Sequence, residues 1–101
     1  MEKIKYVGID ELSIEENEMI KRLSEEYLPK IERAIRTDVS LVVHVKTHHE
    51  TGKRKQYEFI VRTISTAKTF EASCSEWDLA GSLHKAFQKL EKEIEHRYRD
   101  K

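Results

Sequence analysis

The fold is decided by residues 39–64, VSLVVHVKTHHETGKRKQYEFIVRTI, where two alternating apolar runs flank a polar segment. The first run, residues 39–47, places four apolar side chains on one face of a strand: Val39, Leu41, Val43 and Val45. The second run, residues 56–64, repeats the pattern with three more apolar side chains on one face: Tyr57, Phe59 and Val61. Alternation of this kind predicts two half-buried strands, and the polar residues 48–55 between them predict a long hairpin loop.

An amphipathic helix is expected before this hairpin, over residues 14–36. Its apolar side chains recur at steps of three and four: Ile20, Leu23, Tyr27, Ile31 and Ile35. Ser13 and Glu16 have the spacing of a capping box, which satisfies two free backbone N–H groups at a helix start. Pro29 lies inside the helix and removes one backbone donor, so we expect a kink or a short second helical piece there.

Three further elements complete the chain. Residues 3–9 predict a short first strand, and residues 67–73 predict a fourth strand after a turn. The final helix is expected over residues 76–98, where apolar side chains again recur at helical spacing. Its start is indicated by Ser75, which precedes Asp78 by three residues.

The expected order is therefore β-α-β-β-β-α, an α+β fold. An antiparallel four-stranded sheet with two helices packed on one face places every apolar stripe in the core. The αβββα part of this order is similar to double-stranded RNA-binding domains. The 101 residues show no internal repeat or boundary, so we expect one domain over residues 1–101.

The formal net charge is zero, because 19 basic side chains balance 19 acidic ones. Bulk charge therefore gives no reason to expect nucleic-acid binding. The charge is nevertheless segregated along the chain. Residues 36–70 hold 7 basic and 3 acidic side chains, whereas residues 1–35 hold 6 basic and 9 acidic ones. The middle third can thus present a local positive field.

Several kinds of chemistry are not indicated by the sequence. We find no convergent acid, base, nucleophile or glycine-rich phosphate loop, so we expect neither an enzyme nor a small-molecule substrate or cofactor. His48, His49 and Glu50 stand on one extended loop without a second ligand cluster, which argues against a metal site.

Cys74 is the single cysteine, and we expect it to be a small buried core residue in a cytoplasmic protein. Trp77 is expected to act as a lid on the core. No apolar run is long enough to span a membrane.

Basic residues give the strongest functional signal. Candidates on the hairpin or the open face of the predicted sheet are Lys46, Lys53, Arg54, Lys55, Arg62 and Lys68. The last helix adds three more at steps of three and four: Lys85, Lys89 and Lys92. Such rows suit a phosphate backbone, and we expect them to converge into one positive strip. His44 on the polar strand face fits either base stacking or an ordinary surface position. A solvated, salt-bridged helix stays open as the other interpretation, because three carboxylates interrupt the last helix: Glu91, Glu93 and Glu95.

The pattern resembles the ribosome hibernation-promoting factors, also called ribosome-associated inhibitors or sigma modulation proteins (S30EA-like). Residues 70–73, FEAS, followed by residues 76–79, EWDL, are similar to the family's strand ending in Ala-Ser and the start of its last helix. Residues 88–94, QKLEKEI, resemble its Lys-Leu-Glu-Arg-Gln-Leu segment. Residues 28–33, LPKIER, are similar to its Leu-x-Lys-Leu-Glu-Lys.

The resemblance implies a non-enzymatic protein that binds the small ribosomal subunit and its 16S-type rRNA. It would occupy the channel for messenger and transfer RNA and block translation during dormancy or stress. The basic positions that match the family are Lys30, Arg33, Lys89 and Lys92. The chain departs from it at Glu93 and His96 and in the acidic pair Glu25 and Glu26. Because the chain ends at residue 101, we expect the short form, a monomer without the C-terminal dimerisation domain of the long form.

Two other functions stay open from the sequence. A general double-stranded-RNA-binding module fits the αβββα order, but the start of its last helix is usually basic, whereas residues 75–78 are acidic. A protein-interaction domain without nucleic acid fits the neutral net charge.

Overall fold

Six elements follow one another in the order β-α-β-β-β-α, which confirms the expected α+β fold. The computed structural model describes residues 3–49, 55–66 and 68–99. Within these ranges the elements are β1 (Ile4–Val7), α1 (Ile14–Ile35), β2 (Ser40–His49), β3 (Lys55–Ile64), β4 (Glu71–Glu76) and α2 (Leu79–Arg99).

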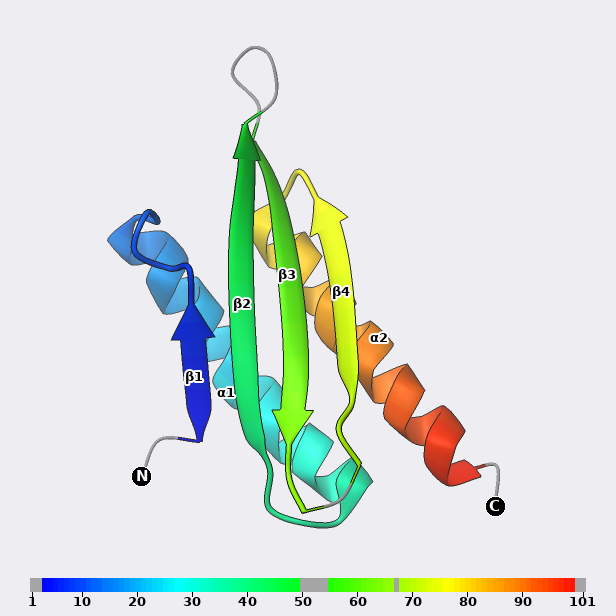
Figure 1. Ribbon diagram of the computed structural model, residues 1–101. Helices are drawn as coiled ribbons and strands as arrows, with labels where there is room; N and C mark the ends of the chain where they lie inside the picture. The colour runs from blue at the N-terminus through cyan, green and yellow to red at the C-terminus, as the bar shows by residue number, and fades with distance from the viewer. Residues whose placement is uncertain (1–2, 50–54, 67, 100–101) are drawn as a thin grey trace.

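The four strands form one sheet in the order β1-β2-β3-β4, and both helices cover the same face of it (Figure 1). The pairs β2–β3 and β3–β4 are antiparallel, as expected. β1, however, runs parallel to β2, so the expectation of a fully antiparallel sheet is wrong at its first strand. The reason is the crossover: α1 carries the chain back along the sheet, so β2 starts beside the start of β1.

The core lies between the sheet and the two helices. Strand residues facing the helices are fully or almost fully buried: Leu41, Val43, Val45, Phe59 and Val61. The helices bury their predicted stripes against them, and the largest fully buried helical side chains are Ile20, Ile31, Leu83, Phe87, Leu90 and Ile94. The alternation in the strands and the helical spacing thus give one apolar layer.

α1 begins with the predicted capping box. The Glu16 backbone N–H donates to Ser13 Oγ at 3.2 Å, and the Ser13 backbone N–H donates to Glu16 Oε1 at 2.9 Å. The helix passes Pro29 as one element, so the expected second helical piece is absent. Pro29 itself is exposed, so water can satisfy the carbonyl that loses its helical donor. The helix ends at Ile35, and its C-cap residue, Arg36, has a left-handed backbone with φ 67°.

The hairpin strands are longer than predicted. β2 reaches His49 and β3 begins at Lys55, so the predicted loop over residues 48–55 is shortened from both sides. The residues 50–54 lie outside the described part of the chain.

β4 starts four residues later than predicted, at Glu71 rather than at residue 67. Thr63 explains the shift, because its Oγ1 accepts the Phe70 backbone N–H at 2.9 Å and its own N–H donates to the Phe70 carbonyl at 2.9 Å. Regular pairing with β3 then begins at Glu71, opposite Arg62.

α2 also starts later than expected, and its cap is Asp78 rather than Ser75. The Gly81 backbone N–H donates to Asp78 Oδ2 at 2.7 Å, and the Ser82 N–H donates to the Asp78 carbonyl at 2.9 Å. Trp77, expected as a core lid, is 42% exposed beside this cap, so that expectation is wrong.

Gly8, directly after β1, is the position where the backbone requires glycine. Its φ is +84°, and a Cβ built there would lie 2.3 Å from the Val45 carbonyl oxygen. The turn out of β1 therefore passes too close to β2 for any side chain.

Candidate nucleic-acid interface

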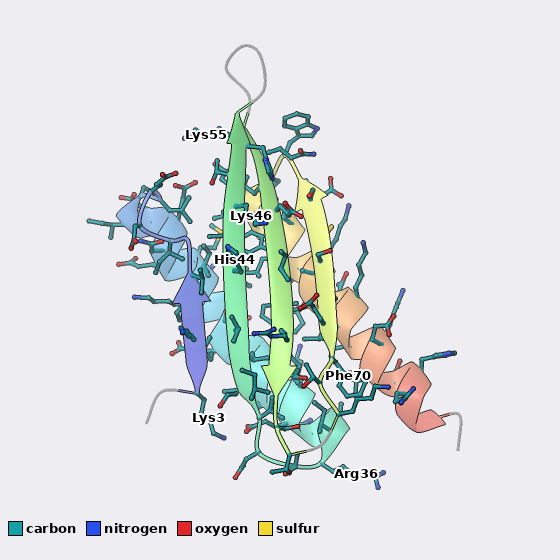
Figure 2. All side chains as sticks on the ribbon, in the orientation of Figure 1. Lys3, Arg36, His44, Lys46, Lys55 and Phe70 are labelled. Atoms are coloured by element: carbon teal, nitrogen blue, oxygen red, sulfur yellow. The ribbon has the colours of Figure 1, made fainter. Side chains whose placement is uncertain are left out.

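The open face of the sheet, which is the face away from the helices, carries two of the predicted cations. Lys46 on β2 and Arg62 on β3 are both exposed there, and Figure 2 shows Lys46 beside His44 on this face. Each has a carboxylate as its cross-strand neighbour, because Lys46 pairs with Glu58 and Arg62 pairs with Glu71. The positive field of this face is therefore locally offset.

One other member of the hairpin set, Lys55, lies off the open face. Lys55 pairs with His49, which places it in the register of the helix-covered face. There its charge contributes to lowering the pKa of Glu16 at the start of α1. The main cause of that lowered pKa is the hydrogen bond from the Ser13 backbone. Lys53 and Arg54 lie outside the described residues.

The three predicted cations of α2 form a second group, here called the α2 ridge: Lys85, Lys89 and Lys92. All three are exposed. Lys85 forms an ion pair with Glu76 at the end of β4, and this hydrogen bond raises the pKa of Lys85. Lys89 donates from Nζ to the Ser73 carbonyl oxygen of β4 at 3.3 Å. Among the described residues neither Lys89 nor Lys92 has an ion-pair partner, so two of the three charges are available to a ligand.

A third group of basic residues, which the sequence did not place together, extends the α2 ridge toward the C-terminal end of the helix. Lys68, in the connection before β4, lines a hollow of about 170 Å³ together with His96 and Arg97 of α2. Glu71 and Glu93 line the same hollow, so its charge is mixed. Sequence reasoning did not select Arg97, although it follows Lys85 and Lys89 at multiples of four residues. Glu93 occupies the position between Lys89 and Arg97 in that row, so the spacing of basic residues did not indicate Arg97.

On α1, the cations suggested by the family resemblance face a different environment. Lys30 Nζ lies 5.1 Å from the centre of the Tyr27 ring, a cation–π contact, and Arg33 is exposed one turn later. The neighbouring side of α2 is acidic, since Glu91 and Glu95 line a hollow between the helices with Ala34 and Lys92. The described candidates thus fall into separate groups on both sides of the sheet, and the expectation of one strip is wrong. Periodicity in the sequence predicts which residues are exposed, but it does not predict on which side of the sheet the exposed residues lie.

The remaining candidates have ordinary structural places. Cys74 is half-buried on the helix-covered face and packs against the core, close to its expected position. His44 is half-buried on the open face. His48 Nε2 lies 3.0 Å from Glu58 Oε1 across the hairpin, and the side chains of His49 and Glu50 are outside the described part. Within the described ranges, no three His, Cys, Asp or Glu side chains are grouped as metal ligands.

The comparison with protein families is decisive. The sequence model described as "Sigma 54 modulation protein / S30EA ribosomal protein" matches residues 9–101. The chain belongs to this family. The S30EA family is one of non-enzymatic, ribosome-associated proteins, so the resemblance inferred from the sequence is confirmed together with its coarse function. No curated protein matches the chain.

Solved structures show that the fold is shared with other proteins at low sequence identity. The N-terminal domain of Protein Y from Thermus thermophilus has a TM-score of 0.63 at 13% identity, covering 94% of this chain and 96% of that one. A ribosomal subunit interface protein from Coxiella burnetii has a TM-score of 0.59 at 18% identity, covering 98% of this chain and 97% of that one.

In the described part of this S30EA chain, neither helix has the length and apolar character needed to cross a membrane.

Proposed function

We propose that this chain binds the small ribosomal subunit, that the α2 ridge contacts rRNA phosphates, and that the bound protein blocks translation during dormancy or stress. Membership of the S30EA family supports ribosome association. The name of the Coxiella burnetii neighbour, a ribosomal subunit interface protein, agrees with a place on the ribosome. A ribosomal role also gives the chain a cytoplasmic location.

The observation that carries the proposal is the position of Lys89 and Lys92. Both are exposed on one helix, and within the described residues neither forms an ion pair with a carboxylate. Lys89 is held near the sheet by the neutral Ser73 carbonyl, so its full charge stays available for a phosphate. A cation bound to a phosphate releases condensed counterions, and this release drives association at low salt.

Inhibition would be steric. The molecule extends 48 × 30 × 17 Å along its principal axes, and its core joins both helices to one sheet. A flat body of this kind, held by phosphate contacts, excludes messenger and transfer RNA from the space it fills. No chemical step is needed, in agreement with the non-enzymatic family.

The structure gives less support to a general duplex-RNA reader. Asp78 caps α2 with its own carboxylate, and Glu76 pairs with Lys85 beside it. The helix start, which can serve as an anion site elsewhere, is therefore already occupied by negative charge.

The proposal is tested by sedimenting the purified chain with isolated small subunits, isolated large subunits and a perfect RNA duplex at low salt. We expect co-sedimentation with small subunits, no binding to the duplex, and inhibition of a cell-free translation reaction at the same protein concentration. Equal binding to the duplex would favour the general RNA module. Binding to none of them would favour a protein-interaction domain and reject the proposal.

A further inference from the structure

The open face of the sheet has no covering layer among the described residues, because both helices lie on the other face (Figure 1). None of the described strand residues that point to this face is buried. Its middle is nevertheless apolar, since Val7, Val42 and Ile60 are half-buried there and Ile64 is 48% exposed. An apolar area of this kind, rimmed by charged side chains, is typical of a surface that binds a protein.

The register of the strands aligns the open-face side chains in rows across the sheet. One row has charges at both ends and runs from β1 to β4: Lys5, Val42, Arg62 and Glu71. The next row has His44 opposite Ile60 at its centre, and the row beyond it has Lys46 opposite Glu58. In both charged rows a lysine thus lies on the β1–β2 side of the sheet and a carboxylate on the β3–β4 side.

This arrangement is complementary to itself. A two-fold axis parallel to the strands, between β2 and β3, places β1 of one copy over β4 of the other, and β2 over β3. Lys5 then faces Glu71 of the second copy, and Lys46 faces Glu58 of the second copy. The symmetry repeats each contact, so lysine–carboxylate contacts surround the apolar middle on both sides. Packed sheets cross at about 30°, and the long lysine side chains can span the resulting offset.

The charges that would meet are available. Among the described residues, Lys5, Lys46 and Glu71 form no ion pair, although Lys46 is the cross-strand neighbour of Glu58. The formal net charge of zero also means that two copies do not repel each other at long range.

We propose that the open face of the sheet binds the open face of a second copy of this chain, giving a two-fold symmetric dimer. Val42, His44 and Ile60 form its centre, and the lysine–carboxylate contacts set its orientation. This dimer differs from the monomer expected from the sequence. Both helices lie on its outer sides, so the α2 ridge stays exposed in each copy and the dimer does not depend on RNA binding.

Sedimentation equilibrium of the purified chain over a range of concentrations tests for the dimer. We expect the mass to rise with concentration from that of one chain toward that of two. Glu58 already contacts His48, so the variants reverse the other charge pair. In Lys5→Glu and in Glu71→Lys like charges face each other twice, and each variant alone should dimerise at least ~10-fold more weakly than the parent chain.

Mixing makes the test specific. In an equimolar mixture of Lys5→Glu with Glu71→Lys, each chain faces opposite charges on the other, so tight association should return. A variant that merely folds poorly would not recover in this way. Lys21→Glu on α1 and Glu95→Lys on α2 make the same charge changes at exposed positions of the helices. Both should dimerise like the parent chain.

Backbone amide shifts on dilution of the isotope-labelled chain locate the interface by NMR. The largest shifts should fall on β2 and β3, around His44 and Ile60. Shifts confined to the helices would overturn the proposal, as would the mass of one chain at millimolar concentration. A mixture of the two variants that associates no more tightly than either variant alone would also overturn it.

Discussion

The Tyr27 hydroxyl lies 3.0 Å from His84 Nδ1 and joins the two helices across the core. The Tyr27 ring also stacks on Phe87, with ring centres 4.6 Å apart and planes within 11°. Burial raises the pKa of Tyr27, so the hydroxyl stays protonated and available for this hydrogen bond. This contact fixes how α1 and α2 lie relative to each other, and hence where their cations stand.

Removing the hydroxyl should therefore destabilise the fold without a large loss of packing. We expect Tyr27→Phe to lower the free energy of unfolding by about 0.5–1.5 kcal/mol, the usual net contribution of one hydrogen bond. Urea denaturation measures it. Combining Tyr27→Phe with His84→Ala gives a cycle whose coupling energy should be of the same size. A coupling energy near zero would show that the contact does not stabilise the helix pair.

The capping box predicts an acid-sensitive contribution to stability. Hydrogen bonds from Ser13 and Tyr57 hold the pKa of Glu16 below its ordinary value of 4.5, with the Ser13 backbone as the larger cause. Since the folded-state pKa is lowered, the stabilisation is present above pH 4.5 and is lost as the pH falls through the folded-state pKa.

The variant Glu16→Gln isolates this effect, because glutamine keeps the capping-box geometry but does not titrate. Its unfolding free energy should depend less on pH between about pH 5 and pH 3 than that of the parent chain. Denaturation at several pH values gives the comparison, and identical slopes for the two proteins would contradict the assignment.

Gly8 and Gly81 are described glycines at which an added Cβ would meet another group. Their replacement by alanine should change the stability of the fold by different amounts. At Gly8 the positive φ and the 2.3 Å approach to the Val45 carbonyl make a Cβ incompatible with the turn. Gly8→Ala should lower stability by more than about 2 kcal/mol. At Gly81 a Cβ would lie 2.9 Å from Asp78 Oδ2, the cap oxygen, which must shift slightly, whereas alanine favours the helix, so Gly81→Ala should change stability by less than about 1 kcal/mol. Thermal melting of both variants checks the contrast, and equal losses would reject it.

Most of the fold followed from periodicity in the sequence. The alternation around Leu41 and Phe59 gave the hairpin and its buried face, and the Ser13–Glu16 pair gave the start of α1. Errors arose where a single side chain decided the boundary. Thr63 sets the start of β4, and Asp78 sets the start of α2. Each acts through one hydrogen-bonding side chain, which leaves no periodic pattern in the sequence.

The candidate interface was less accessible to sequence reasoning. The spacing of Lys85, Lys89 and Lys92 correctly predicted neighbours on one helix, but not that Lys85 is paired with Glu76. The parallel pairing of β1 with β2 was also missed, because it follows from the crossover through α1.

The central claim is that the exposed cations of α2 hold the chain on the small ribosomal subunit. It is tested most directly by co-sedimentation with small subunits over a salt series, comparing the parent chain with Lys89→Glu/Lys92→Glu. The variant Lys5→Glu/Lys21→Glu serves as a control of equal net charge.

We predict that the Lys89→Glu/Lys92→Glu variant binds at least ~10-fold more weakly at low salt, and that the slope of log affinity against log salt falls by about 1–2. The control should resemble the parent chain in both quantities. Equal affinity and equal slope in the parent and the Lys89→Glu/Lys92→Glu variant, or no binding by the parent even at low salt, would contradict the claim.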